Sequence, residues 1–315
     1  MRRPSLPPMR PSTSHSKRNS ATATLVFMFA FLLTSLAANA QNDSHGLQVV
    51  TSIRPLALIV EDIVGEHGEA VALIDAGDSP HHYALTPSAR LQAARADFLV
   101  WVGAELEVSL TGLFASSPDV ISAEQLPGIV LHDLGGHHPD LHLWLNTDNA
   151  RLIAKAIAAR ATEQDPLNAD YYARRLSAFE AEQLANNEAI AAALARADLV
   201  SRPYAVYHDA YQYFERQFGV SHAVGLVEDP ERAPSIRELA ATRAALAEAK
   251  PVCLLFEPDS DRRLIETALN STQLRQVEMD ILGYRITRNS SEVSGYGLLM
   301  RALVDDLLTC LRPEN

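Results

Sequence analysis

The chain has 315 residues, with 27 basic and 39 acidic side chains and a formal net charge of −12 at pH 7. Such an acidic composition argues against a nucleic-acid partner, because binding to phosphates favours a basic surface. An acidic surface would attract cations, although the same charge would also serve only to keep the protein soluble. The length exceeds what one compact core usually accommodates, so we expect two lobes.

Residues 1–40 have the composition of a secretory signal peptide. The first 24 residues contain five basic and no acidic side chains, an apolar run from Leu25 to Leu33 follows, and Ala38-Asn39-Ala40 matches a small-x-small cleavage site. A membrane anchor is the alternative, but it needs about 20 apolar residues, and polar residues interrupt the run here. We therefore expect export to the periplasm, with cleavage near Ala40.

Residues 41–166 alternate between short apolar runs and helical patterns, which predicts right-handed βαβ units around a mostly parallel sheet. We expect the strands of this N-terminal lobe at Leu47–Ser52, Ala70–Ile74, Phe98–Val102 and Gly128–Leu131. We expect its helices at Pro55–Val64, Ser88–Ala94 and Glu105–Phe114.

Residues 167–199 are predicted to form one long helix that connects the two lobes. A preceding helix over Asn149–Gln164 is ended by Asp165-Pro166, and the stretch Asn168–Ala197 then runs without Gly or Pro. A straight helix of that length spans about 45 Å at 1.5 Å per residue. Its apolar positions form only a partial stripe, which suits a rigid connection better than a helix bundle.

Residues 200–315 resume the alternation of strands and helices. We expect strands at Tyr204–Tyr207, His222–Val227, Val252–Phe256 and Gln276–Asp280. We expect helices at Ala210–Gln217, Ser235–Glu248, Arg262–Leu269 and Gly297–Leu311. The predicted fold is therefore α/β, with two (β/α)4-type lobes that each contain a mostly parallel sheet and are joined by the long rigid helix.

Three histidines and one carboxylate follow predicted strands. His81 lies in the loop after the second strand, His142 lies in the connection after the fourth, and His208 directly follows the strand that ends at Tyr207. Asp280 ends the last strand. Ligands of open α/β sheets bind at the carboxyl ends of strands, and imidazoles with one carboxylate suit Zn²⁺. A single histidine beside a strand is usually an ordinary polar residue, so the residue types and their spacing favour a metal site and a structural role about equally.

Two cysteines, Cys253 and Cys310, occur in the last third of the chain. In an oxidising compartment an even number of cysteines indicates a disulfide. Two buried free thiols are the alternative.

Four segments resemble the zinc-binding substrate-binding proteins of ABC transporters, the ZnuA type. They are Ser79–Ser88, Ala96–Gly103, Leu141–Leu145 and Tyr207–Phe214. The last of these is the most specific, and the resemblance extends in order over the whole chain after the signal peptide. It implies two four-stranded lobes bridged by a long helix, which agrees with the fold predicted above.

The resemblance also implies a ligand set and a role. His81, His142 and His208 would bind Zn²⁺, with water or Asp280 as the fourth donor, and Cys253 would be bonded to Cys310. The protein would be a periplasmic monomer that delivers Zn²⁺ to the permease of an ABC importer in the inner membrane. Three imidazoles with an ordinary pKa of about 6.5 would make zinc affinity fall steeply below that pH, because protons compete with the metal.

The sequence departs from the family pattern at two places. Many zinc-binding members have a long His-rich loop before the second motif, whereas only His132, His137 and His138 occupy that stretch here. Whether these three form an auxiliary site is left open. Some members have Glu before the first ligand, where this chain has Pro80, so one potential fourth donor is missing.

The residue types also bear on three alternative functions. Manganese and iron relatives resemble the same architecture but have Glu at the position of His208, and a harder oxygen donor suits Mn²⁺. A stand-alone zinc buffer or adhesin is a further alternative, because the surface that would dock on a permease has no readable motif. We expect no enzyme activity, since the chain has no His-Glu-x-x-His helix, no Gly-x-Ser-x-Gly turn and no Gly-rich phosphate loop.

Overall fold

The structure is a computed structural model that describes residues 46–133, 139–197, 202–228, 230, 232–270, 272–287 and 294–313. The predicted signal peptide and its cleavage site lie outside the described residues. Residues from Gly46 onward form one compact unit. No helix in this described part of the chain is long and apolar enough to cross a bilayer.

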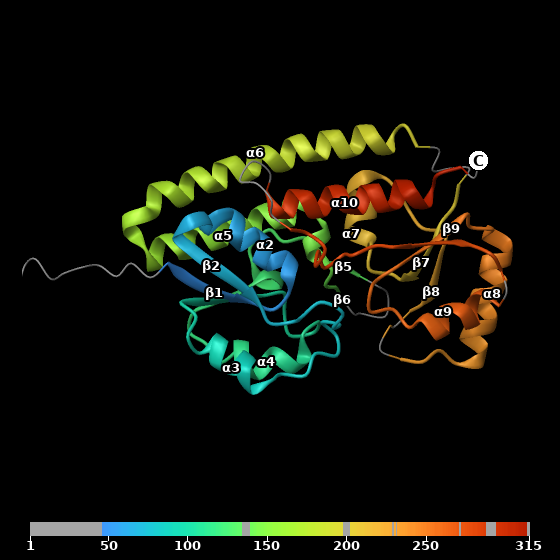
Figure 1. The fold of residues 1–315 in the computed structure, drawn as a ribbon, viewed down its shortest axis with the longest axis horizontal. Helices are drawn as coiled ribbons and strands as arrows, with labels where there is room; N and C mark the ends of the chain where they lie inside the picture. Colours follow the sequence, from blue (N-terminus) through green and yellow to red (C-terminus); the bar gives the residue numbers. More distant parts are fainter. Residues whose placement is uncertain are drawn as a thin grey trace, which may run out of the picture. The chain divides into compact units, whose positions relative to one another are not determined.

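The N-terminal sheet has four parallel strands in the order β2-β1-β3-β4. Their bounds are β1 Leu47–Thr51, β2 Gly68–Ala72, β3 Phe98–Trp101 and β4 Val120–Ser122. The strand β3 is buried along its whole length, as expected for a central parallel strand covered on both faces. Figure 1 shows helices α2 and α5 on one side of the sheet and the short helices α3 and α4 on the other. These helices span Arg54–Val64 (α2), Pro87–Ala93 (α3), Thr111–Phe114 (α4) and Thr147–Gln164 (α5).

The fourth strand of this sheet was predicted wrongly. It is β4, Val120–Ser122, and the predicted segment Gly128–Leu131 belongs to no strand. Val130 and Leu131 are 51% and 44% exposed, so only Ile129 of this apolar run packs against the core. The run leads instead into a two-stranded antiparallel hairpin formed by β5, His132–Asp133, and β6, Pro139–Asp140.

The predicted helix Glu105–Phe114 is also shorter than expected. It consists of a 3-10 turn at Val108–Leu110 followed by α4. The reason lies in Glu107, whose buried carboxylate accepts hydrogen bonds from the backbone N–H groups of Val102 and Gly103. The residues between β3 and the 3-10 turn therefore fold around this side chain as a loop.

The C-terminal sheet repeats the arrangement, with four parallel strands in the order β10-β9-β7-β8. The strands are β7 Ala205–His208, β8 Val224–Val227, β9 Cys253–Phe256 and β10 Arg275–Glu278. The helices are α7 Gln212–Phe218, α8 Ile236–Ala249, α9 Arg262–Leu269 and α10 Gly295–Cys310. Each predicted strand and helix of this lobe is present, with bounds that differ by at most two residues. In both sheets the first and third strands are neighbours, which creates the switch point where open α/β sheets bind ligands.

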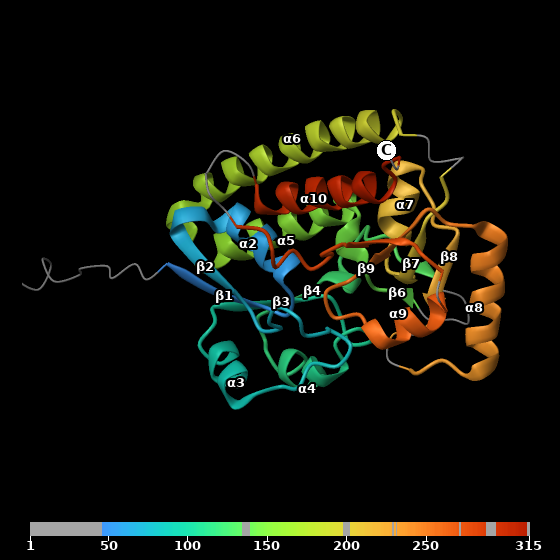
Figure 2. The ribbon, with the colours of Figure 1, turned by 45° about the vertical axis from the view of Figure 1, so that its right-hand side comes forward.

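The long connecting helix is confirmed. Helix α6, Ala169–Leu194, has 26 residues and therefore spans about 39 Å. It starts after a 3-10 turn, Pro166–Asn168, and ends a few residues before the predicted limit. Figures 1 and 2 both show α10 running alongside α6, and Tyr172, Phe179, Ile190 and Leu194 of α6 are buried.

Helix α10 ties the two halves of the chain together. It packs against α2 of the N-terminal half as well as against β9 and β10, and one buried hydrophobic cluster includes residues of both sheets. Cys253 and Cys310 form the expected disulfide, with Cα atoms 5.5 Å apart and a sequence separation of 57. Closing a loop of that length stabilises the fold by about 4 kcal/mol in the chain-entropy model. The limits 41–166, 167–199 and 200–315 stay a prediction, because the core continues across them.

Candidate metal centre

Three histidines from distant parts of the chain converge on one point. One donor nitrogen of each of His81, His142 and His208 lies within 4.8 Å of the other two, and the ring centroids are 5.3–6.3 Å apart. Within the described ranges, this is the one cluster of at least three His, Cys, Asp or Glu residues with such spacing. The three side chains are close enough for one small cation to contact all of them.

Each histidine is positioned by the local fold. His81 lies in a turn between β2 and α3, where its backbone N–H donates to the hydroxyl of Ser79. His142 follows β6 and directly precedes a 3-10 turn, Leu143–Leu145. His208 is the last residue of β7. The sequence-based prediction placed the ligands at the ends of sheet strands, and this describes His208 best, because the other two belong to longer connections.

Buried carboxylates orient two of the histidines. Asp140 Oδ1 lies 2.8 Å from His142 Nδ1 and also accepts a hydrogen bond of 2.9 Å from the backbone N–H of His142. Glu257 Oε2 lies 3.1 Å from His208 Nδ1. A carboxylate at Nδ1 fixes the tautomer that leaves the Nε2 lone pair free to bind a metal. His208 Nε2 is buried and has no hydrogen-bond partner among the described residues, as expected of an atom that receives a ligand.

Neither carboxylate was predicted as part of the site, although the sequence contains a signal for each. Asp140 is two residues before His142, close enough to bond its imidazole. Glu257 follows the end of β9, and β9 pairs in parallel with β7 so that Val206 is opposite Leu255. Continuing this register by two residues places Glu257 beside His208.

The electrostatic environments of His81 and His208 differ. Burial, together with the neighbouring His142 and His208, lowers the pKa of His81 to about 3. Burial also disfavours a charged His208, but the Glu257 carboxylate outweighs that effect and raises the pKa of His208 above its usual value. At neutral pH, His81 is therefore uncharged and available to a cation, whereas protons compete more strongly at His208.

The comparison with known families agrees with this donor set. The sequence model of the family ZnuA, described as zinc-uptake complex component A, periplasmic, matches residues 49–310. The chain belongs to the ZnuA family. Membership confirms the expectation that the chain is not an enzyme, since the family consists of components of uptake systems.

A relative and two solved structures illustrate the extent of the similarity. The high-affinity zinc uptake system protein ZnuA of Yersinia pestis is 31% identical over 294 residues, which cover 84% of this chain and 91% of that protein. A crystal structure of ZnuA has a TM-score of 0.72 at 21% identity and covers 85% of this chain and 100% of that one. The periplasmic zinc-binding protein TroA of Treponema pallidum has a TM-score of 0.74 at 20% identity, with the same coverage. These structures confirm the fold.

Asp280 is not part of the histidine cluster. Its side chain is buried, with one oxygen accepting from the backbone N–H of Gly283 at 2.8 Å and the other from that of Arg285 at 2.8 Å. The Arg285 side chain is 3.7 Å away. The structure therefore brings together three of the four predicted ligands, and it holds Asp280 within the turn that follows β10. Zinc binding by Asp280 stays a prediction.

The remaining histidines of this region have other roles or positions. His82 is exposed and lines the cleft beside His81. His132 Nδ1 lies 3.1 Å from an Arg216 nitrogen, and His137 and His138 lie outside the described residues. An auxiliary site of these histidines in this ZnuA-family chain is therefore untested.

The cleft around the three ligands is small and is lined by both polar and apolar residues. It has a volume of about 110 Å³, and its walls include Trp144, Ile281 and Leu282. Trp144 Nε1 donates a hydrogen bond of 3.0 Å to the backbone carbonyl of Ile281, which connects the two halves of the chain at the edge of the cleft. Apolar walls exclude water and strengthen the electrostatic attraction between a cation and its ligands.

Proposed function

We propose that this chain captures Zn²⁺ with His81, His142 and His208 and delivers it to an ABC importer as its periplasmic binding component. The observation that carries the proposal is the convergence of three imidazoles, two of which are oriented by buried carboxylates. Zn²⁺ prefers tetrahedral nitrogen and sulfur surroundings. The nitrogen of His208 at the third position supports zinc over manganese, which favours oxygen donors.

The cellular setting is part of the same proposal. Residues 1–40 would direct export and be removed near Ala40, and the mature protein would act as a monomer. Its partner would be the permease in the inner membrane. The acidic composition and the family membership support this setting.

The fourth coordination position would be taken by water or another small ligand from solvent. Both oxygens of Asp280 are engaged by backbone N–H groups, whereas the three imidazoles leave one position of a tetrahedron open. A site of this kind holds the ion firmly and still leaves a position at which another donor can start to displace it.

Metal analysis of the purified mature protein tests the proposal. We expect one zinc ion per chain, and in competition with a chelator we expect binding well below 1 µM, which corresponds to more than about 8 kcal/mol. Cobalt substitution should give the intense visible absorption of a tetrahedral ion. Sub-stoichiometric binding, or an octahedral cobalt spectrum, would contradict the proposed ligand set.

Asp280→Ala is expected to reduce zinc affinity by less than about tenfold, because a water molecule is as good a fourth donor, whereas the fold should lose about 1–3 kcal/mol for each of the two backbone N–H groups left unsatisfied. Chelator competition and urea unfolding measure the two effects separately. A loss of affinity as large as that of a histidine variant would instead identify Asp280 as a metal ligand.

A further inference from the structure

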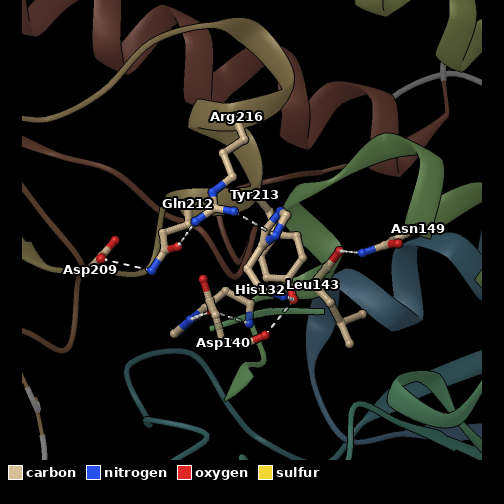
Figure 3. A network of polar contacts seen from close by, with 9 residues as sticks. His132, Asp140, Leu143, Asn149, Asp209, Gln212, Tyr213 and Arg216 are labelled. Carbon is tan, nitrogen blue, oxygen red and sulfur yellow. Dashed lines mark hydrogen bonds and ion pairs between the residues drawn. The ribbon is translucent and has the colours of Figure 1, made fainter. Parts of the chain in front are cut away.

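The side chain of Tyr213 holds the base of the β5–β6 hairpin. Tyr213 is fully buried and belongs to α7 in the C-terminal half of the chain. Its hydroxyl donates to the backbone carbonyl of Asp140 at 2.6 Å and accepts from the backbone N–H of His132 at 3.1 Å. His132 and Asp140 are paired across the hairpin, so one hydroxyl bonds both strands at the same rung, as Figure 3 shows.

The residue held in this way is the one that orients a metal ligand. Asp140 is fully buried, and its carboxylate bonds both the ring and the backbone N–H of His142. A displacement of the Asp140 backbone would therefore move the carboxylate and turn the imidazole. Tyr213 in turn is five residues after His208 in the same segment. The segment from His208 to Tyr213 therefore contains one proposed ligand, His208. It also holds Asp140, which orients a second proposed ligand, His142.

Helix α7 also contacts the outer side of the β5–β6 hairpin. Arg216 donates to His132 Nδ1 at 3.1 Å and to the side-chain oxygen of Gln212 at 3.0 Å. The rings of His132 and Tyr213 pack with centroids 4.4 Å apart. Figure 3 shows these side chains arranged around the hairpin on the side of α7. The hairpin base therefore has its position set by α7 through both polar and ring contacts.

We propose that Tyr213 is a positioning residue for zinc binding, which pre-sets the orientation of His142 through Asp140 before the ion arrives. The proposal rests on the proposed function, because it assigns a role toward the zinc ligand His142. Its physical basis is that outer-shell partners of a metal-bound histidine fix the direction of its lone pair, and their loss usually reduces metal affinity by about 10–100-fold. Tyr213 does not contact the ion itself.

Tyr213→Phe keeps the ring packing and removes only the hydroxyl. We expect zinc affinity, measured by chelator competition on the purified mature protein, to fall by up to about tenfold, at the lower end of the roughly 10–100-fold loss typical of residues that bond the histidine directly, because Tyr213 acts through Asp140. Cobalt-loaded protein should show shifted visible bands, because the His142 nitrogen no longer approaches from the same direction. A merely structural role of the phenol would leave these bands unchanged.

Tyr172→Phe is the matched control. Tyr172 is likewise fully buried, and its hydroxyl donates a bond of similar length, 2.7 Å, to Asp165. The other bond of that Asp165 oxygen is to Asn168, and not to a histidine of the metal centre. This variant should bind zinc and cobalt as the wild type does. Wild-type affinity and an unchanged cobalt spectrum in Tyr213→Phe would overturn the proposal, and if His142→Ala in the same series loses zinc binding, the proposed function still stands. Wild-type affinity in His142→Ala would instead refute the proposed function.

Discussion

Replacement of His208 with alanine is expected to weaken zinc binding by more than about 100-fold. The reason is that changes to residues that only support a metal-bound histidine already reduce affinity by about 10–100-fold, and this variant removes a donor atom itself. It also leaves the buried Glu257 carboxylate without the imidazole that bonds it. Chelator competition at pH 7.5 measures the loss. His142→Ala is expected to behave in the same way, because it also removes a donor atom and leaves Asp140 Oδ1 with only the backbone N–H of residue 142 as a partner.

His82→Ala is the control for these variants. His82 lines the same cleft and is adjacent in sequence to His81, but it is exposed and lies outside the cluster of three donors. We expect it to bind zinc as the wild type does. If the His82 variant lost as much affinity as the His208 variant, the ligand set would have to be reassigned. If His208→Ala retained wild-type affinity, the zinc centre described above would be wrong.

The fold was predictable because short apolar runs that alternate with helical patterns are typical of buried parallel strands. The segments around β3, β7 and β9 are short, continuous and bounded by turn residues, and each one is a buried strand. The error at Gly128–Leu131 has the same origin. An apolar run of four residues was interpreted as a strand, but Gly128 has a φ of +89° and turns the chain toward the β5–β6 hairpin. Local composition does not distinguish such a run from β4, whose sequence is no more apolar.

The donor atoms of the site were predictable to different extents. Histidines that follow predicted strands in both halves of the chain left a metal site and a structural role about equally open, and the resemblance of the surrounding motifs selects His81, His142 and His208 as ligands. The carboxylates were harder to assign, since an aspartate after a strand can face the metal or its own backbone. Asp280 satisfies two N–H groups of its own turn. Asp140 and Glu257 support ligands through contacts that depend on the hairpin and on strand register, so the spacing of Asp140 to His142 and the β7–β9 pairing indicate them only once these elements are known.

The arrangement of the helices adds a constraint on motion. Helix α10 packs on α2 and α6 as well as on the C-terminal sheet, and one hydrophobic cluster includes residues of both sheets. Separating the halves would expose part of that buried surface, at about 25 cal/mol per Å² of apolar area. The shared core therefore favours a mechanism in which the halves stay together.

Zinc affinity is expected to fall with decreasing pH by less than about three powers of ten per pH unit, because His81 takes up no proton in the relevant range. Burial and the neighbouring histidines hold the pKa of His81 at about 3, so His81 stays neutral at pH 5 and no proton competes there. For His208 the sign is opposite. The Glu257 carboxylate outweighs burial and raises its pKa, so proton competition at this ligand starts above the usual histidine value and grows as the pH falls.

The dissociation constant for zinc, measured by chelator competition between pH 5.0 and 7.5, gives the number of protons from the slope of its logarithm against pH. Glu257→Gln supplies the comparison: without the carboxylate, His208 should be easier to deprotonate, so the pH at which affinity begins to fall should move downward, even though the absolute affinity decreases with the loss of orientation. A slope near three in the wild type would mean that His81 is protonated together with the other ligands. That result would contradict the buried, mutually repelling arrangement of the three imidazoles on which the site is built.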